Sequence, residues 1–349
     1  MKEHQIVEEL IASELKPLVK KIDLDAYYPE DFMLQLGKSG LLNSSGLTEA
    51  EVLTREVKLV EEISKACMTT GFNLWCHLAS LTYIRKSSNA YLKKEILPLL
   101  ENGGLLGATG LSNPMKYYAG LETLHLSAKQ CDGGYVVSGT LPSVSNLGPD
   151  HWFGFIASVD EHTRIMGLVP CDAKGLTLKE KVDYLGLNGS GTYSCSFDEV
   201  FIPEQWIVSQ DADQYVQEIR PAFLIYQVPL GLGVTESSIS AMDKVCNRQG
   251  GCNQYLLVQP DQLKEKLEPI REKTYQIAAA ESIKEHTEEL MRLRLNIAYL
   301  TLEAVQANML HQGGSGYLQK SESSRRLREA YFLANLTPTI KHLEKMLQK

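Results

Sequence analysis

The sequence predicts an α+β protein in three consecutive parts: an N-terminal helical domain (residues 1–105), a middle antiparallel β-barrel (106–209) and a C-terminal four-helix bundle (210–349). Two observations predict this order. Apolar residues recur every few positions, with the helical period, in the first and last parts, and short alternating strands with many turn residues fill the middle. The 349 residues, 44% of them hydrophobic, are enough for such domains to have cores of their own.

The first part is predicted to be helical because its apolar residues fall on one face. Within residues 6–22 the apolar side chains recur at helical spacing. Pro29 stands where a helix begins, and Gly37 and Gly40 mark its end. Residues 69–84 are apolar nearly all round, which is typical of a helix buried among other helices.

The middle part is predicted to be a small antiparallel barrel or sandwich. Asp132, Gly133 and Gly134 stand between two alternating runs and form a good hairpin turn. Five candidate strands follow one another at residues 121–130, 134–141, 152–159, 164–170 and 192–202. Short strands at this spacing favour a closed or two-layered antiparallel sheet.

The last part is predicted to be a helical bundle, because long amphipathic segments with short joins return. Four such segments cover residues 221–246, 261–282, 285–310 and 328–347. Helices of this length with short connections suit an antiparallel four-helix bundle.

Composition excludes several classes of function. The formal net charge is −8. Binding to nucleic acid or to an anionic membrane requires a basic face, so neither is expected to be the main partner. The seven cysteines are scattered without a C-x-x-C pair, so no metal site is predicted and reduced thiols in a cytoplasm are expected. The N-terminus is charged throughout and lacks the apolar core of a secretory signal.

Five segments carry a resemblance to a known family. They are residues 14–42, 97–114, 134–159, 184–203 and 312–330. In this order and near this spacing they resemble the acyl-CoA dehydrogenase superfamily, and the match runs nearly end to end. The resemblance implies that family's three-part fold and a flavin site between the barrel and the bundle.

The resemblance also assigns the residues of a FAD site. Backbone and hydroxyl groups of Thr109, Leu111 and Ser112 would meet the pyrimidine side of the ring. Ser145 occupies the position whose hydroxyl usually points at the flavin N5. Ser143 replaces the family's usual tryptophan, which implies a wider slot.

Further cofactor contacts are implied near the C-terminus. Gly313 and Gly314 would let a backbone approach the adenine-side phosphates. In the family this turn reaches a neighbouring subunit, which implies a homodimer or homotetramer. Thr339 is a further cofactor-binding candidate. The Arg-x-x-Phe-Gly element that contacts the flavin pyrophosphate is degenerate at residues 248–251.

The catalytic base of the family is absent. In most members a glutamate lies in a turn shortly after an Arg-Asp-Ala segment, and it removes the α-proton of the thioester. Here residues 328–330 match that segment, and the count places Thr337 at the base position. Some members carry the glutamate on the first bundle helix, where this chain has Pro221 or Ala222.

Two other residues are weak candidates for a catalytic role. His342 lies one helical turn beyond Thr337, although a solvated histidine beside Lys341 is the simpler interpretation. Glu236 interrupts an apolar helix and is more simply a helix-surface glutamate. Glu329 is expected to form an ion pair within the surrounding arginine cluster.

Three functions therefore stay open. The first is a FAD-dependent oxidoreductase acting on an acyl thioester, such as an acyl-CoA, or on a similar small substrate, with an electron-transfer partner. The second is a flavin-dependent monooxygenase, in which a partner reductase supplies reduced flavin that activates oxygen. The third is a non-catalytic relative that keeps the fold for binding or assembly.

Overall fold

The N-terminal part is helical in the computed structural model, which describes residues 2–348. Its helices are α1 (Lys2–Leu10), α2 (Val19–Leu24), α3 (Glu30–Lys38), α4 (Glu49–Ala66), α5 (Met68–Lys86) and α6 (Leu97–Glu101). A capping box begins α4: the Thr48 hydroxyl accepts from the Glu51 amide at 3.3 Å, and the Glu51 carboxylate accepts from the Thr48 amide at 2.8 Å.

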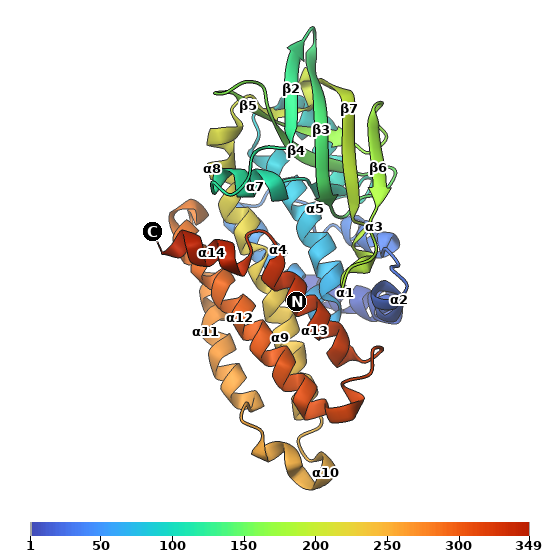
Figure 1. Ribbon diagram of the computed structural model, residues 1–349, viewed down its shortest axis with the longest axis vertical. Coiled ribbons are helices and arrows are strands. Elements are labelled where there is room, and N and C mark those ends of the chain that lie inside the picture. The colour runs from blue at the N-terminus through green and yellow to red at the C-terminus, as the bar shows by residue number, and fades with distance from the viewer. Residues whose placement is uncertain (1, 349) are drawn as a thin grey trace.

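Helix α5 links the helical parts to the sheet. Every residue from Met68 to Ile84 is buried, which confirms the prediction of a helix surrounded by protein. It contacts α4, α8 and α9 among the helices and β1 in the sheet. In Figure 1 the sheet lies at one end of the long axis and most of the C-terminal helices at the other.

The middle part is one eight-stranded sheet. Its strands are β1 (Gly107–Thr109), β2 (Leu126–Cys131), β3 (Gly134–Val144), β4 (Trp152–Ser158), β5 (Arg164–Pro170), β6 (Leu176–Glu180), β7 (Tyr193–Pro203) and β8 (Ile207–Ser209). They follow the order β6-β7-β3-β2-β4-β5-β8, and β1 pairs with β4. The predicted hairpin is confirmed, since Cys131 pairs with Gly134 across a turn in which Gly133 has a φ of +74°.

The fold class is confirmed, but the sheet is mixed where a purely antiparallel barrel was expected. Strand β4 runs parallel to both β1 and β2. The chain reverses direction twice between β2 and β4, once into β3 and once out of it, so β4 points the same way as β2. Among the described residues β6 and β8 are the two edge strands of this order, and they do not pair with each other.

A short helix that the sequence analysis does not predict follows β1. Helix α7 (Ser112–Tyr118) occupies this place and contacts β3. Asn113 in the first turn of α7 holds the segment that follows the helix, since its side chain donates to the Thr123 carbonyl oxygen at 2.9 Å and accepts from the His125 amide at 3.0 Å.

The C-terminal part is a bundle of long helices with shorter ones at its ends. They are α8 (Ala212–Ile225), α9 (Val228–Asp243), α10 (Arg248–Gly251), α11 (Pro260–Ala278), α12 (Thr287–Gln312), α13 (Glu322–Asn335) and α14 (Ile340–Leu347). Helix α9 packs on α4, α11 and α12, and α13 packs on α12.

Two segments that the periodicity predicts as single helices are broken. The first breaks at Tyr226 and Gln227, and Pro229 then stands in the first turn of α9, where its missing amide hydrogen costs nothing. The second breaks after Asn335, because Pro338 disfavours helical geometry at Thr337. Both breaks place backbone groups near the interface of sheet and bundle.

Two hydrophobic cores support this arrangement. The larger one runs through the helices of both helical parts. The smaller one lies within the sheet, where Phe153 and Phe155 pack on Phe197 with ring centroids 6.0 and 5.8 Å apart. None of the helices between residues 2 and 348 combines the length and the apolar composition that a bilayer crossing requires.

Candidate functional site

A cavity of about 130 Å³ lies where the sheet meets the helices. Its lining consists of Phe72, Trp75, Cys76, Thr109, Ser112, Ser143, Ser145, Phe223, Phe332, Asn335, Leu336 and Thr337. Four of the predicted cofactor-binding residues and the residue at the predicted base position are among them. The fold thus brings together side chains from positions 109–112, 143–145 and 337.

Hydroxyl groups form one side of this cavity. The Thr109 hydroxyl lies 2.6 Å from the Tyr83 hydroxyl, whose pKa is raised by burial, so the phenol keeps its proton. The Ser112 hydroxyl lies 3.0 Å from the Thr337 hydroxyl and joins α7 to the turn after α13. These groups are held in fixed positions by partners inside the chain.

Ser143 in β3 and Ser145 directly after β3 complete the polar part of the lining. The Ser145 hydroxyl lies 2.7 Å from that of Thr192, which is 2.7 Å from that of Ser190. Because a hydroxyl both donates and accepts, these three linked hydroxyl groups can still offer one hydrogen bond to a ligand. Ser143 is exposed, and its short side chain leaves room beside the cavity.

Aromatic rings form another part of the lining. Phe72 stacks on Trp75 at 5.4 Å between ring centroids and meets the edge of Phe332 at 4.7 Å. Trp75 in turn meets Phe223 at 4.8 Å. Sequence reasoning missed this wall, although the aromatic residues of the all-apolar segment 69–84 were a signal.

A buried arginine and glutamine hold the turn that carries Thr337. The Gln227 amide donates to the Thr337 carbonyl oxygen at 2.9 Å. Arg294 donates to the Gln227 side-chain oxygen at 2.8 Å and to the Leu333 carbonyl oxygen at 2.5 Å. Both side chains are wholly buried, and burial lowers the Arg294 pKa to about 9. Two anchor points therefore fix the turn from inside the bundle.

Gln227→Glu tests this anchoring. The carboxylate keeps its contact with Arg294 but loses the donor to Thr337, so we expect the amides of residues 336–341 to exchange roughly 3–10-fold faster, as the loss of one hydrogen bond implies. Hydrogen–deuterium exchange with mass spectrometry measures this. Thr235→Val is the control, because it removes a buried hydroxyl contact to Thr301 elsewhere in the bundle. Equal exchange in all three proteins would contradict the anchoring role.

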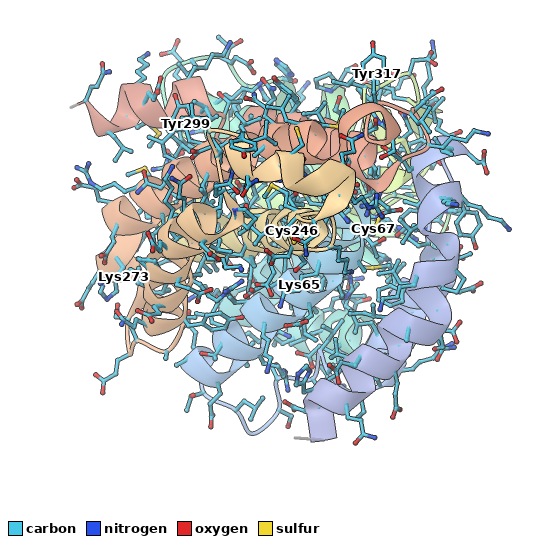
Figure 2. The ribbon with its side chains drawn as sticks, turned by 90° about the horizontal axis from the view of Figure 1, so that it is seen from below. Lys65, Cys67, Cys246, Lys273, Tyr299 and Tyr317 are labelled. Carbon is cyan, nitrogen blue, oxygen red and sulfur yellow. The ribbon has the colours of Figure 1, made fainter. Side chains whose placement is uncertain are left out.

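Four predicted cofactor contacts lie outside the cavity lining. Leu111 is buried, and Thr339 caps α14 by accepting from the His342 amide at 3.2 Å. Gly313 and Gly314 form the turn after α12, with open space around them and a φ of +57° at Gly313. This turn leads to the exposed Tyr317 (Figure 2).

Of the two weak catalytic candidates, Glu236 lies apart from the cavity. Its carboxylate is paired with Arg271, and the Lys65 ammonium lies 3.8 Å away (Lys65 is labelled in Figure 2). Its side chain is 37% exposed, as expected for a helix-surface glutamate. It therefore takes part in an ion-pair network that joins α4, α9 and α11.

His342 is not solvated, contrary to the simpler interpretation of the sequence. It is only 4% exposed because α14 folds back against α12. Its pKa is lowered to about 4, chiefly by burial and then by the charge of Arg220, so the imidazole is neutral. It lines a separate small cavity, which Phe223 divides from the first.

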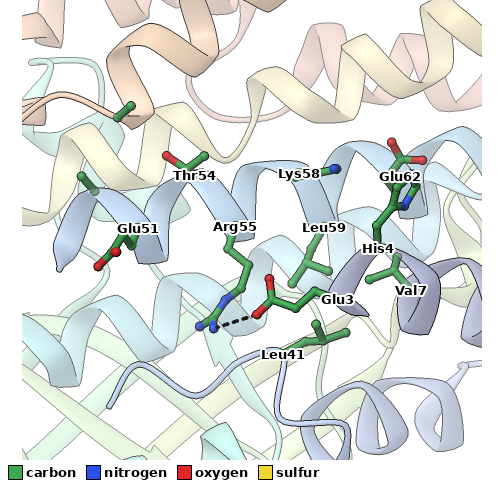
Figure 3. A pocket seen from close by; sticks show the side chains of 12 residues that line it. Glu3, His4, Val7, Leu41, Glu51, Thr54, Arg55, Lys58, Leu59 and Glu62 are labelled. Carbon is green, nitrogen blue, oxygen red and sulfur yellow. Dashed lines mark ion pairs between the residues drawn. The ribbon is translucent and has the colours of Figure 1, made fainter. Parts of the chain in front are cut away.

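A larger cavity of about 500 Å³ lies between α1 and α4 (Figure 3). It contains none of the predicted site residues. Its charged residues have mixed signs, and the Arg55 guanidinium lies 3.9 Å from the Glu3 carboxylate. We place the candidate site at the smaller cavity, because the predicted cofactor-binding and base positions meet there with aromatic side chains from distant parts of the chain.

Comparisons with known proteins give matches to acyl-CoA dehydrogenases. Residues 4–104 match the model of the acyl-CoA dehydrogenase N-terminal domain. The chain is 24% identical to the mitochondrial short-chain specific acyl-CoA dehydrogenase of Mus musculus, over 93% of this chain and 83% of that protein.

Solved structures show the same fold over the whole chain. The glutaryl-coenzyme A dehydrogenase–glutaryl-CoA complex superimposes with a TM-score of 0.89 at 18% identity, over 100% of this chain and 94% of that one. KijD3, solved with FMN and a dTDP-sugar, superimposes with a TM-score of 0.73 at 16% identity, over 99% of this chain and 92% of that one.

Proposed function

This chain is of the acyl-CoA dehydrogenase type, by its N-terminal domain and by its fold over the full length. On this basis we propose that it is a flavin-dependent oxidoreductase. Its substrate would be an acyl thioester or a similar small molecule. The observation that carries the proposal is the convergence of Thr109, Ser112, Ser145 and Thr337 on one cavity that aromatic rings also line.

The residues of the cavity fit a flavin ring in their chemistry. An isoalloxazine needs a flat apolar slot with hydrogen-bonding groups along its edge. Thr109, Ser112 and Ser145 would supply that edge, while Trp75 and Phe223 belong to the apolar wall. When bound, the flavin would supply hydride acceptance, which no side chain of the chain can provide.

The size of the cavity implies that a second surface completes the cofactor site. Its volume of about 130 Å³ is below the range of roughly 300–1,000 Å³ that is usual for ligand pockets. We therefore propose FAD held partly by a second copy of the chain, with Gly313 and Gly314 facing that copy's cofactor. Residues 248–251, of which the first three are exposed and the last three have positive φ, would replace the usual pyrophosphate contact.

The base position distinguishes this site from a dehydrogenase that removes an α-proton. Thr337 has no acidic group, and the lining of the cavity contains no Asp, Glu, His or Lys among the described residues. Burial raises the pKa of the Cys76 thiol, so that group stays protonated. This favours, as a second candidate, a flavin monooxygenase that takes reduced flavin from a partner reductase and activates oxygen.

The cysteines support a proposal for the cellular location. All seven cysteines are free, and four of them are buried, which supports a reducing, cytoplasmic compartment as part of the proposal.

Acyl-CoA substrates and Thr337→Glu together test the reaction class. If the cavity accepts a thioester, the added carboxylate should speed bleaching of bound flavin by an acyl-CoA at least about 100-fold, the usual minimum for a positioned base. Stopped-flow absorbance measures the rate, and Thr337→Gln is the control of equal size. If none of the three proteins bleaches with any acyl-CoA, while reduced flavin supports oxygen consumption, the monooxygenase is the correct assignment.

A further inference from the structure

His342 is a buried side chain without a partner. It is 4% exposed, and neither ring nitrogen has a hydrogen-bond partner within residues 2–348. A buried polar group left in this state costs about 1–3 kcal/mol. Native structures keep such groups where a ligand, ion or water provides the partner.

Arg220 lines the same cavity and is half-buried. Burial alone lowers its pKa, and no charged group of the described chain compensates for the burial. No hydrogen bond or ion pair to its guanidinium occurs between residues 2 and 348. A guanidinium in such a half-buried position is well suited to bind a carboxylate or a phosphate.

The charges around the cavity have one sign. The groups that act on His342 are Arg220, Lys116 and Lys345, all cationic. Of these, Lys116 is paired with Glu122 at 2.9 Å and Lys345 is exposed, so Arg220 is the half-buried cation that has no ion-pair partner within residues 2–348. Arg220 donates hydrogen bonds, and neutral His342 donates one more, so the missing partner is an anionic acceptor.

The rest of the wall is apolar and adaptable. Met115, Met291 and Met346 line the cavity together with Leu224 and Pro338. Methionine side chains are flexible and repack readily around a ligand. The volume in the present arrangement is about 10 Å³, comparable to one water. A larger ligand would enter by movement of Met346, which lies on the last helix and is partly exposed.

We propose that this cavity is a carboxylate-binding subsite, in which Arg220 and His342 bind the carboxylate of a small acid and the three methionines surround its short apolar tail. The tail is what favours a carboxylic acid over inorganic phosphate. Only the role of the subsite rests on the proposed function: Phe223 and the Thr337–Pro338 turn separate it from the flavin cavity, so it would hold the acidic end of a substrate whose other end reaches the flavin.

Sodium butyrate is the probe. The NMR signals of the His342 imidazole protons are the readout, and they are assigned by their absence from the spectrum of His342→Gln. In an NMR titration without flavin we expect a saturable shift of these protons, and a higher pKa for His342 in the presence of butyrate, because an anion favours the charged imidazole. By calorimetry, Arg220→Gln should weaken butyrate binding about ten- to hundredfold, as the loss of a hydrogen bond to a charged group implies.

Arg292→Gln is the matched control. This arginine lies on α12 next to Met291 but is 56% exposed and paired with Glu288, so butyrate binding should be unchanged. No saturable shift of His342 with butyrate in the wild type would overturn the proposal even if Arg220→Gln does not fold. So would equal binding in Arg220→Gln, or a response to inorganic phosphate alone. Flavin uptake, followed separately by absorbance, shows whether the proposed function fails independently.

Discussion

Glu329→Ala is expected to lower the free energy of unfolding by about 3–5 kcal/mol, the usual cost of breaking a buried ion pair from one side. Glu329 forms the expected ion pair with Arg325 at 2.8 Å, and both side chains are at most 4% exposed. The same carboxylate accepts from the Thr69 amide at 3.2 Å, at the start of α5. The variant leaves a buried cation and an unpaired helix terminus, and urea unfolding followed by tryptophan fluorescence measures the loss.

Two further variants separate the ion pair from its surroundings. The double variant Arg325→Met with Glu329→Met removes both charges, so it should be more stable than Glu329→Met alone. Glu322→Gln removes a half-exposed partner of Arg325 and should cost at most about 1 kcal/mol. A double variant as unstable as the single one would show that packing, not the uncompensated charge, causes the loss.

Ser145→Phe is expected to weaken flavin binding by at least about ten- to hundredfold, the cost of overpacking a closed site. The ring would enter a cavity of about 130 Å³ and would displace the hydroxyl that is linked to Thr192. Flavin fluorescence quenching gives the affinity.

Ser196→Phe is the control for this prediction. Ser196 lies at an exposed position of β7 in the same sheet, so the same change there should leave flavin affinity unaltered. If Ser145→Phe binds flavin as tightly as the wild type, the ring does not occupy this cavity.

Periodicity was enough to predict the order of the three parts, because helical and strand repeats differ along the chain. It was not enough to find the breaks at Gln227 and Thr337, since the residues around each keep an apolar helical pattern. Helix α7 was missed for the opposite reason: its seven residues are too few to show a period.

The polar half of the cavity was predictable only through the resemblance, which placed Thr109, Ser112 and Ser145 at one site. The aromatic half was not, because Phe72, Phe223 and Phe332 are far apart in the sequence and tertiary packing alone collects them.

The burial of Arg294 and His342 also escaped prediction, since charged and polar helix residues are normally exposed. Arg294 anchors the turn that carries Thr337 through Gln227, and His342 lines a cavity together with Pro338 of the same turn. This is where function, rather than packing, is expected to have set the residues.

The absorbance spectrum of the purified chain after incubation with FAD and removal of free cofactor tests the central claim most directly. If the cavity binds the isoalloxazine, the protein should retain about one flavin per chain, with the absorbance band of oxidised flavin near ~450 nm. A colourless protein that takes up neither FAD nor FMN would contradict the account and leave a non-catalytic relative in its place.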